Sequence, residues 1–286
     1  MNRKTCAFAV MAALLTASFA GQAAAQKQGG ILREYMVDSP ASMSVHEEST
    51  VVSERPMMGV FNNLVLFDQH VKQNNPDVIL PDLATGWSWS EDGTELTFPL
   101  REGVKWHDGK PFTARDVKCT WDMLAGKSSE KLRINPRKAW YRNLEEVITN
   151  GDYEVTFHLK RPQPGFLSLL ASGWAPVYPC HVPPRDMRSH PIGTGPFKFV
   201  EFKPNEHIWV TRNPDYWKQG YPYLDGVEYT ILKNRSTVIL AFIAGKYDLT
   251  FAGSVSIPLM RDIKNQMPDA ICESPPGSVK TNLNQS

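Results

Sequence analysis

The pair His107 and Asp108 holds the residue types that most readily suggest chemistry in this sequence. An imidazole beside a carboxylate can act as a general base if a nucleophile and an orienting group lie within hydrogen-bond reach. The sequence contains no Gly-x-Ser-x-Gly turn, no His-Glu-x-x-His motif and no phosphate-binding loop. We therefore expect no enzyme activity and keep an exported hydrolase as the least favoured alternative.

Cys180, His181 and His190 form a second group, because these side chains can bind metals. They lie within residues 176–191, which hold five prolines and therefore predict an irregular loop. Their spacing matches no zinc motif. The sequence predicts no metal site and no other cofactor.

The N-terminus has the pattern of a secretory signal peptide. Arg3 and Lys4 give a basic start, residues 6–20 are apolar and uncharged, and small residues favour cleavage near Ala25. A lipoprotein would need a cysteine directly after this site, where Gln26 stands. We expect a soluble exported chain, periplasmic in a host with two membranes.

Three cysteines remain after the signal peptide, at Cys119, Cys180 and Cys272. Export permits a disulfide, but three cysteines allow one bridge at most and leave one thiol over. The sequence leaves their pairing open, and we interpret them mainly as small buried hydrophobic residues.

The charge balance excludes one class of partner. The sequence has 31 basic and 30 acidic residues, a formal net charge of +1, and no basic stripe. Nucleic-acid-binding domains concentrate Lys and Arg on one face. We therefore expect no nucleic acid partner.

Strands alternate with helices in the second half of the sequence, which favours a mixed α/β fold. Strict alternation predicts a strand at 153–159, and Pro99 places the strand at 94–100 at an edge or a bulge. Thr113 suits the start of a helix at 113–125. Further strands are expected at 29–33, 197–202, 207–210, 227–232 and 247–251, further helices at 54–66, 236–244 and 257–266, and a polar turn region at 68–81.

Residues 84–121 carry many anchors in a fixed order: a tryptophan pair, two Asp-Gly turns, an Arg-x-Gly and a Thr-Ala-x-Asp-Val helix start. These anchors are Trp87, Trp89, Asp92, Gly93, Arg101, Gly103, Trp106, His107, Asp108, Gly109, Thr113, Asp116 and Val117. Their order resembles the signature of family 5 extracellular solute-binding proteins, the dipeptide and oligopeptide receptors of ABC importers. Two later blocks and a Gly-x-x-Asp turn support the resemblance, namely Gly193-Thr194-Gly195-Pro196-Phe197, Arg212-Asn213-Pro214-Asp215-Tyr216-Trp217 and Gly245 with Asp248.

The resemblance implies a periplasmic-binding-protein type II-like fold. After a signal peptide at 1–25, a first lobe would comprise 26–65 and 192–268, with a small inserted domain at 66–191. Family chains are nearly twice as long, so 269–286 would begin a second large lobe that is otherwise missing. We expect the three tryptophans of the signature to pack the inserted domain's sheet rather than line a pocket.

The resemblance also implies a function, which is the capture of di- or oligopeptides, or a related small solute, for the membrane permease subunits of an ABC importer. In peptide-binding relatives an extended segment pairs with the ligand backbone, and here it would be Ser49-Thr50-Val51-Val52. A truncated non-functional fragment or interaction module is the alternative.

A second candidate contact is Phe251-Ala252-Gly253-Ser254, where small residues would let a ligand approach the backbone. An ordinary strand-to-helix loop is an equally good interpretation of this segment.

Overall fold

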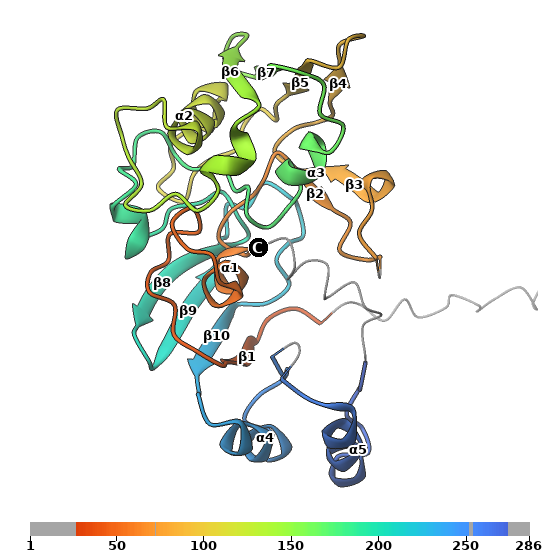
Figure 1. Cartoon of the computed structure of the whole chain (residues 1–286). Coiled ribbons are helices and arrows are strands. Elements are labelled where there is room, and N and C mark those ends of the chain that lie inside the picture. The colour runs from red at the N-terminus through yellow and green to blue at the C-terminus, as the bar shows by residue number, and fades with distance from the viewer. Residues whose placement is uncertain (1–26, 72, 252–253, 274–286) are drawn as a thin grey trace, which may run out of the picture.

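The structure is a computed structural model that describes residues 27–71, 73–251 and 254–273. It contains two four-stranded sheets and a two-stranded one, with helices beside them, so the mixed α/β prediction is confirmed. In Figure 1 one large sheet lies in the lower half of the molecule and the other in the upper half. The predicted signal peptide lies outside the described residues.

The lower sheet joins the beginning of the chain to its later part. Its strands are ordered β1 (Ile31–Met36), β10 (Gly226–Ile231), β9 (His207–Arg212) and β8 (Phe197–Lys203). β1 runs parallel to β10, whereas the other neighbours are antiparallel. Nearly two hundred residues therefore separate two hydrogen-bonded strands in the sequence.

The upper sheet is wholly antiparallel, in the order β4 (Ser88–Trp89), β5 (Glu95–Pro99), β7 (Glu154–Leu159) and β6 (Leu144–Thr149). Helix α2 (Ala114–Ala125) packs against β6 and β7. The core between them is rich in large aromatic side chains, which are Phe98, Trp106, Phe112, Trp121, Phe157 and Phe166. Trp87 and Trp89 pack against this core and are partly buried, so the expected role of the three signature tryptophans is confirmed.

The remaining elements are short. Helices α1 (Val51–Met57) and α3 (Phe166–Leu170) lie near the junction of the two halves, with α4 (Arg235–Ile243) and α5 (Ile257–Gln266) at the lower end in Figure 1. Strands β2 (Val65–Phe67) and β3 (Ile79–Pro81) form the small sheet. Three 3-10 turns complete the order, at η1 (Pro76–Val78), η2 (Lys138–Tyr141) and η3 (Asp186–Arg188).

Helix α2 shows how local chemistry sets element ends. Thr113 and Asp116 form a capping box, in which each side chain accepts from the other residue's backbone N–H. Gly126 ends the helix with φ of 78°, a left-handed conformation that glycine adopts without strain. The predicted bounds of this helix are confirmed, as are those of α5.

The helix predicted at 54–66 is wrong at both ends, because α1 covers only Val51–Met57. Beyond it, the carbonyls of Gly59 and Val60 accept hydrogen bonds from Phe197 N and Gly195 N, both at 2.9 Å. A continued helix would need the same carbonyls for its own i→i+4 bonds. Contacts with a distant segment therefore end the helix.

Three further predictions, two of strands and one of a turn region, also need correction. The strand expected at 247–251 is a single bridge between Leu249 and Glu34, and the turn region expected at 68–81 includes η1 and β3. Strand β5 is not at an edge, since β4 and β7 flank it. Pro99 is tolerated because it is the last residue of β5, beyond the reach of the two-residue β4.

The cysteines are also not simply buried hydrophobic residues, since Cys119 and Cys180 form a disulfide and Cys272 is exposed. The disulfide joins α2 to the proline-rich loop, across 61 residues of sequence. Two hydrogen bonds hold the same contact, from Cys180 N to Asp116 Oδ1 at 2.8 Å and from Tyr178 N to Thr120 Oγ1 at 2.9 Å.

Candidate ligand-binding site

The first predicted ligand segment is extended only as far as Thr50. Thr50 has φ of −116° and ψ of 144°, whereas Val51 and Val52 already belong to α1, which corrects the expectation of an extended stretch through Val52. The helix begins here because Thr50 O accepts from Ser53 N, Ser53 Oγ and Glu54 N. Among the described residues, no group accepts from the N–H of Ser49 or Thr50, and both residues are exposed.

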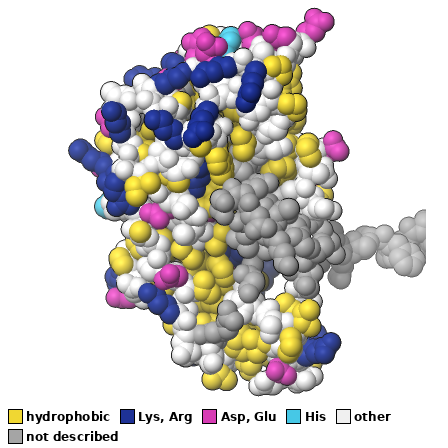
Figure 2. Space-filling view, in the orientation of Figure 1, with side chains coloured by type: hydrophobic (Ala, Val, Ile, Leu, Met, Phe, Trp, Pro, Cys, Tyr) yellow, Lys and Arg dark blue, Asp and Glu magenta, His cyan; other side chains and the backbone are white. Residues whose placement is uncertain are grey.

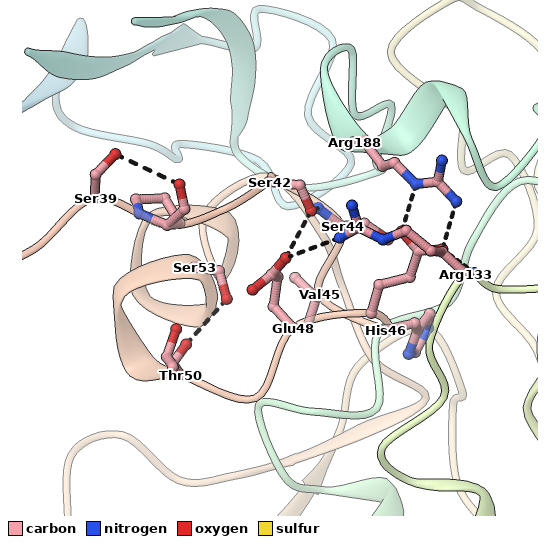
Figure 3. A network of polar contacts seen from close by, with 12 residues as sticks. Ser39, Ser42, Ser44, Val45, His46, Glu48, Thr50, Ser53, Arg133 and Arg188 are labelled. Carbon is pink, nitrogen blue, oxygen red and sulfur yellow. Dashed lines mark hydrogen bonds and ion pairs between the residues drawn. The ribbon is translucent and has the colours of Figure 1, made fainter. Parts of the chain in front are cut away.

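A network of buried polar groups holds residues 42–48, which lead into this segment (Figure 3). Arg188 donates two hydrogen bonds to the buried Glu47 carboxylate, at 2.6 and 2.8 Å, and Arg133 N donates a third. Burial by itself would raise the pKa of Glu47, but the hydrogen bonds and charges of the two arginines lower it below its usual value. The segment is thus tied to the 3-10 turn η3 and to the loop before η2.

Arg137 fixes the backbone on the other side of this segment. Its guanidinium donates to Val45 O at 3.1 Å and Glu48 O at 2.6 Å, and stacks over Trp174 with 3.9 Å to the ring centre. Burial lowers the pKa of Arg137 to about 10, which leaves it charged at neutral pH. The backbone before Ser49 is therefore held from two directions.

The second predicted segment lies close to the first. Phe251 is half-buried, and the Arg55 guanidinium of α1 lies 5.5 Å from its ring centre. Arg55 Nε also pairs with the buried Glu34 carboxylate of β1 at 2.7 Å. Ser254 Oγ donates to Phe251 O at 2.6 Å. Ala252 and Gly253 lie outside the described residues.

A cavity of about 400 Å³ begins at Val51 and extends between α1 and residues 171–176. Apolar side chains make much of its wall, including Met57, Phe61, Leu66 and Trp174. Glu54 adds a carboxylate one helical turn after Val51, and burial raises its pKa to about 7 against the lowering charge of Arg137. The sequence did not indicate Glu54, because the helix was predicted to start at residue 54 and Val51 was assigned to an extended segment. Only α1, which begins at Val51, places the two side chains at an i, i+3 spacing.

The residues that suggested catalysis join the two halves of the molecule instead. His107 Nδ1 accepts from Gly193 N at 3.3 Å, which leaves Nε2 to donate to Gly195 O at 3.0 Å. Burial lowers the pKa of His107 to about 4, so the ring is neutral. His181 pairs with Asp108 at 2.7 Å. Both nitrogens of His107 are therefore engaged in structural contacts.

The glycines of the Gly-Thr-Gly block are explained by close packing. A Cβ at Gly193 would lie 1.9 Å from Val60 O, and one at Gly195 would lie 2.6 Å from Gly59 O. Thr194 between them donates to Asn62 at 3.1 Å. Only glycine allows this segment to approach the end of α1 so closely.

Neither a cluster of metal ligands nor a membrane-spanning helix occurs among the described residues. No group of three or more His, Cys, Asp or Glu side chains in that part of the chain could hold a metal ion. No helix within it is long and apolar enough to cross a membrane.

The family model for bacterial extracellular solute-binding proteins, family 5 Middle, matches residues 78–284. The chain belongs to this family. The resemblance seen in the signature residues is therefore confirmed, and family 5 proteins are extracytoplasmic binding proteins.

Relatives of known structure show the fold of this family 5 chain. The oligopeptide-binding protein AppA of Bacillus subtilis is 34% identical over 171 residues, which is 56% of this chain and 30% of AppA. Its structure with a nonapeptide has a TM-score of 0.73 and 28% identity, covering 84% of this chain and 47% of that one. The fold is thus periplasmic-binding-protein type II-like.

Other family 5 relatives differ in the ligands that their names give. The glutathione-binding protein GsiB of Salmonella typhi is 26% identical over 213 residues, covering 73% of this chain and 40% of its own length. MoaA of A. tumefaciens R10, solved with mannopinic acid, has a TM-score of 0.73 and 25% identity, covering 85% and 48% of the two chains. The chain spans 30% to 40% of the length of the curated relatives it matches.

Proposed function

We propose that the chain is the substrate-binding part of an ABC importer, which captures di- or oligopeptides or a related small solute by reversible binding. One observation carries the proposal: the exposed Ser49 and Thr50 have N–H groups that bond to no acceptor among the described residues, and this segment leads directly to the cavity at Val51. A ligand backbone could pair with these groups, as in other proteins that bind extended peptides. Its side chains would then reach the cavity.

The ligand contacts proposed in the first lobe are Ser49, Thr50, Val51, Phe251, Ala252 and Gly253. The lobe would comprise 26–65 and 192–268, and the inserted domain 66–191. The two separate sheets and their two hydrophobic cores support this division. The proposed partners are the peptide or small solute and the membrane permease subunits, and the proposed location is the periplasm after cleavage near Ala25.

The proposal includes no bond-making or bond-breaking step. It is supported by the engagement of both His107 nitrogens and by the disulfide that occupies Cys180. An exported hydrolase would need a free base beside a nucleophile.

Calorimetry with mixed di- to pentapeptides tests the proposal. We expect saturable binding in the millimolar range, because the described contacts form one wall and must offset an association cost of roughly 4–15 kcal/mol. Thr50→Pro removes one N–H and should abolish binding. Thr50→Ala keeps that N–H, and because the Thr50 side chain makes no capping hydrogen bond, it should bind like the parent.

Absence of saturation with every peptide would reject capture by this chain and favour the fragment or interaction module. Peptide cleavage during the titration would instead favour the hydrolase. Equal binding by the two Thr50 variants would remove the backbone-pairing segment from the site.

A further inference from the structure

Glu54 differs from its polar neighbours because no group donates a hydrogen bond to its carboxylate within residues 27–71, 73–251 and 254–273. Its side chain faces the cavity beside Val51 and is mostly buried. A buried carboxylate is costly unless a donor or a cation compensates it. Glu54 therefore has unused capacity to accept hydrogen bonds at this site.

The nearby donors are occupied elsewhere. Arg137, whose charge acts on Glu54, donates to Val45 O and Glu48 O. Lys218, which lines the same cavity, pairs with Asp82 at 2.7 Å.

The amides of Asn62, Asn63 and Gln69 also line the cavity. Asn63 donates to Leu170 O at 3.3 Å and to Ser172 O at 2.7 Å, Asn62 donates to the Asp82 carboxylate, and Gln69 donates to Phe67 O. The carboxylate of Glu54 is thus left to a group that enters from the cavity.

Gly173, which has no side chain, lies directly against the Glu54 carboxylate. Glu54 Oε1 lies so close to Gly173 that a Cβ at that position would be 2.1 Å away. The carboxylate thus packs against the backbone of Gly173 in the wall of the cavity. The position of the carboxylate is set by the packing of α1 against residues 171–176.

The rest of the wall suggests the shape of the bound group. Met57, Phe61 and Trp174 offer apolar surface next to the carboxylate. An ammonium on an aliphatic stem combines a charge for Glu54 with methylene groups for these side chains. The volume of about 400 Å³ lies within the usual range of small-molecule sites.

We propose that Glu54 binds a primary ammonium group of the captured solute, carried on an aliphatic stem that packs in the cavity beside Val51. The inference rests on the proposed function, which it deepens by naming a class of substrate. The ammonium could be a lysine side chain or a peptide amino terminus.

Three peptides separate these sources in NMR titrations of the full chain. Acetyl-Ala-Lys-Ala carries the ammonium only on its side chain, Ala-norleucine-Ala only at its amino terminus, and acetyl-Ala-norleucine-Ala carries none. We expect one of the first two to bind at least about tenfold more tightly than the third, which is the size of a hydrogen bond to a charged group. Pentylammonium against pentanol repeats the comparison without a peptide backbone.

Variants assign the preference to Glu54. Glu54→Gln keeps the shape and removes the charge, and should abolish the ammonium preference. Gly173→Ala keeps the charge but displaces the carboxylate, and should weaken the preference while the fold, checked by circular dichroism, persists. Glu102→Gln, an equal charge change at an exposed position, should leave binding unaltered.

The outcomes are distinguishable. If all three peptides bind equally, the Glu54 inference fails and the proposed function stands. A different result is that no peptide binds, whereas pentylammonium binds to the parent and not to Glu54→Gln. In that case peptide capture is rejected and the ammonium site at Glu54 is supported. The inference is overturned if Glu54→Gln still prefers ammonium ligands. It is also overturned if the parent shows no ammonium preference with any probe.

Discussion

At the scale of single residues, the pKa of a buried carboxylate in this protein depends on the hydrogen bonds and positive charges that its neighbours provide. Glu47 receives three hydrogen bonds from arginine groups and keeps a lowered pKa in spite of burial. Glu54 receives none among the described groups, and burial raises its pKa to about 7. Two carboxylates on one short stretch of chain thus differ because of their neighbours.

The pKa of Glu54 predicts how stability depends on pH. Because the pKa is raised on folding from about 4.5 to about 7, the protonated form favours the folded state. Stability is then fully present below the unfolded pKa and is lost as pH rises through 7. Glu54→Gln stays neutral, so we expect it to be more stable than the parent by about 1–3 kcal/mol at pH 8 and nearly equal at about pH 4.

Urea unfolding at the two pH values measures this difference. Arg137 is the charged neighbour that acts on Glu54, and it stays protonated over this range. The exposed Glu102→Gln serves as the control and should show no pH-dependent gain. An equal effect of Glu54→Gln at both pH values would contradict a raised pKa.

At the scale of elements, contacts between distant segments decide where elements end and how loops are fixed. The carbonyls at the end of α1 bond to the Gly195–Phe197 backbone, and the proline-rich loop is bonded to α2. The loop has little regular structure apart from η3, so its position depends on such contacts and on the disulfide from Cys180 to Cys119.

Removal of the disulfide should destabilise the chain. Closing a loop of 61 residues restricts the unfolded state, which corresponds to about 4 kcal/mol in the chain-entropy account. We expect Cys119→Ser with Cys180→Ser to lose an amount of this order in denaturant unfolding. Cys272→Ser is the matched control, and because Cys272 is exposed, its effect should stay within about 0.5 kcal/mol.

Thiol labelling provides a second check of the pairing. Without reductant, only Cys272 should react in the folded or unfolded mature chain. Labelling of all three cysteines after unfolding without reductant would show that the disulfide is absent.

At the scale of the whole molecule, the two sheets are joined by polar contacts between segments far apart in the sequence. Asp82 lies next to the small sheet. Its carboxylate accepts a hydrogen bond from Asn62 Nδ2 at 3.0 Å and forms an ion pair with Lys218. His107 bonds to the Gly193–Gly195 segment in a similar way. In Figure 2 basic side chains gather over the upper half, although the whole chain is close to neutral.

The exported chain should begin near Gln26. A basic start followed by an apolar run and small residues is the pattern that signal peptidase processes. Mass spectrometry of the exported protein should show an N-terminus near Gln26 without lipid. Leu15→Arg, which places a charge in the apolar run, should retain Met1 and block export, whereas retention of Met1 in the exported parent would refute the signal.

Some of this structure could be predicted from the sequence because its cause is local. The capping box at Thr113 and Asp116, the αL glycine at Gly126 and the alternation at 153–159 each depend on residues within a few positions. The order of the signature residues likewise predicted the family, and the alternation of predicted strands and helices predicted the mixed α/β fold. These features need no knowledge of what lies on the other side of the molecule.

Other features were decided only by the tertiary structure, because their partners lie far away in the chain. The early end of α1 requires the 195–197 segment, and the disulfide requires the loop to return to α2. Glu54 became a candidate only when packing placed it over Gly173 and directed neighbouring donors to other acceptors. Compensation of a buried charge is a property of three-dimensional surroundings, which no local pattern of residue types can specify.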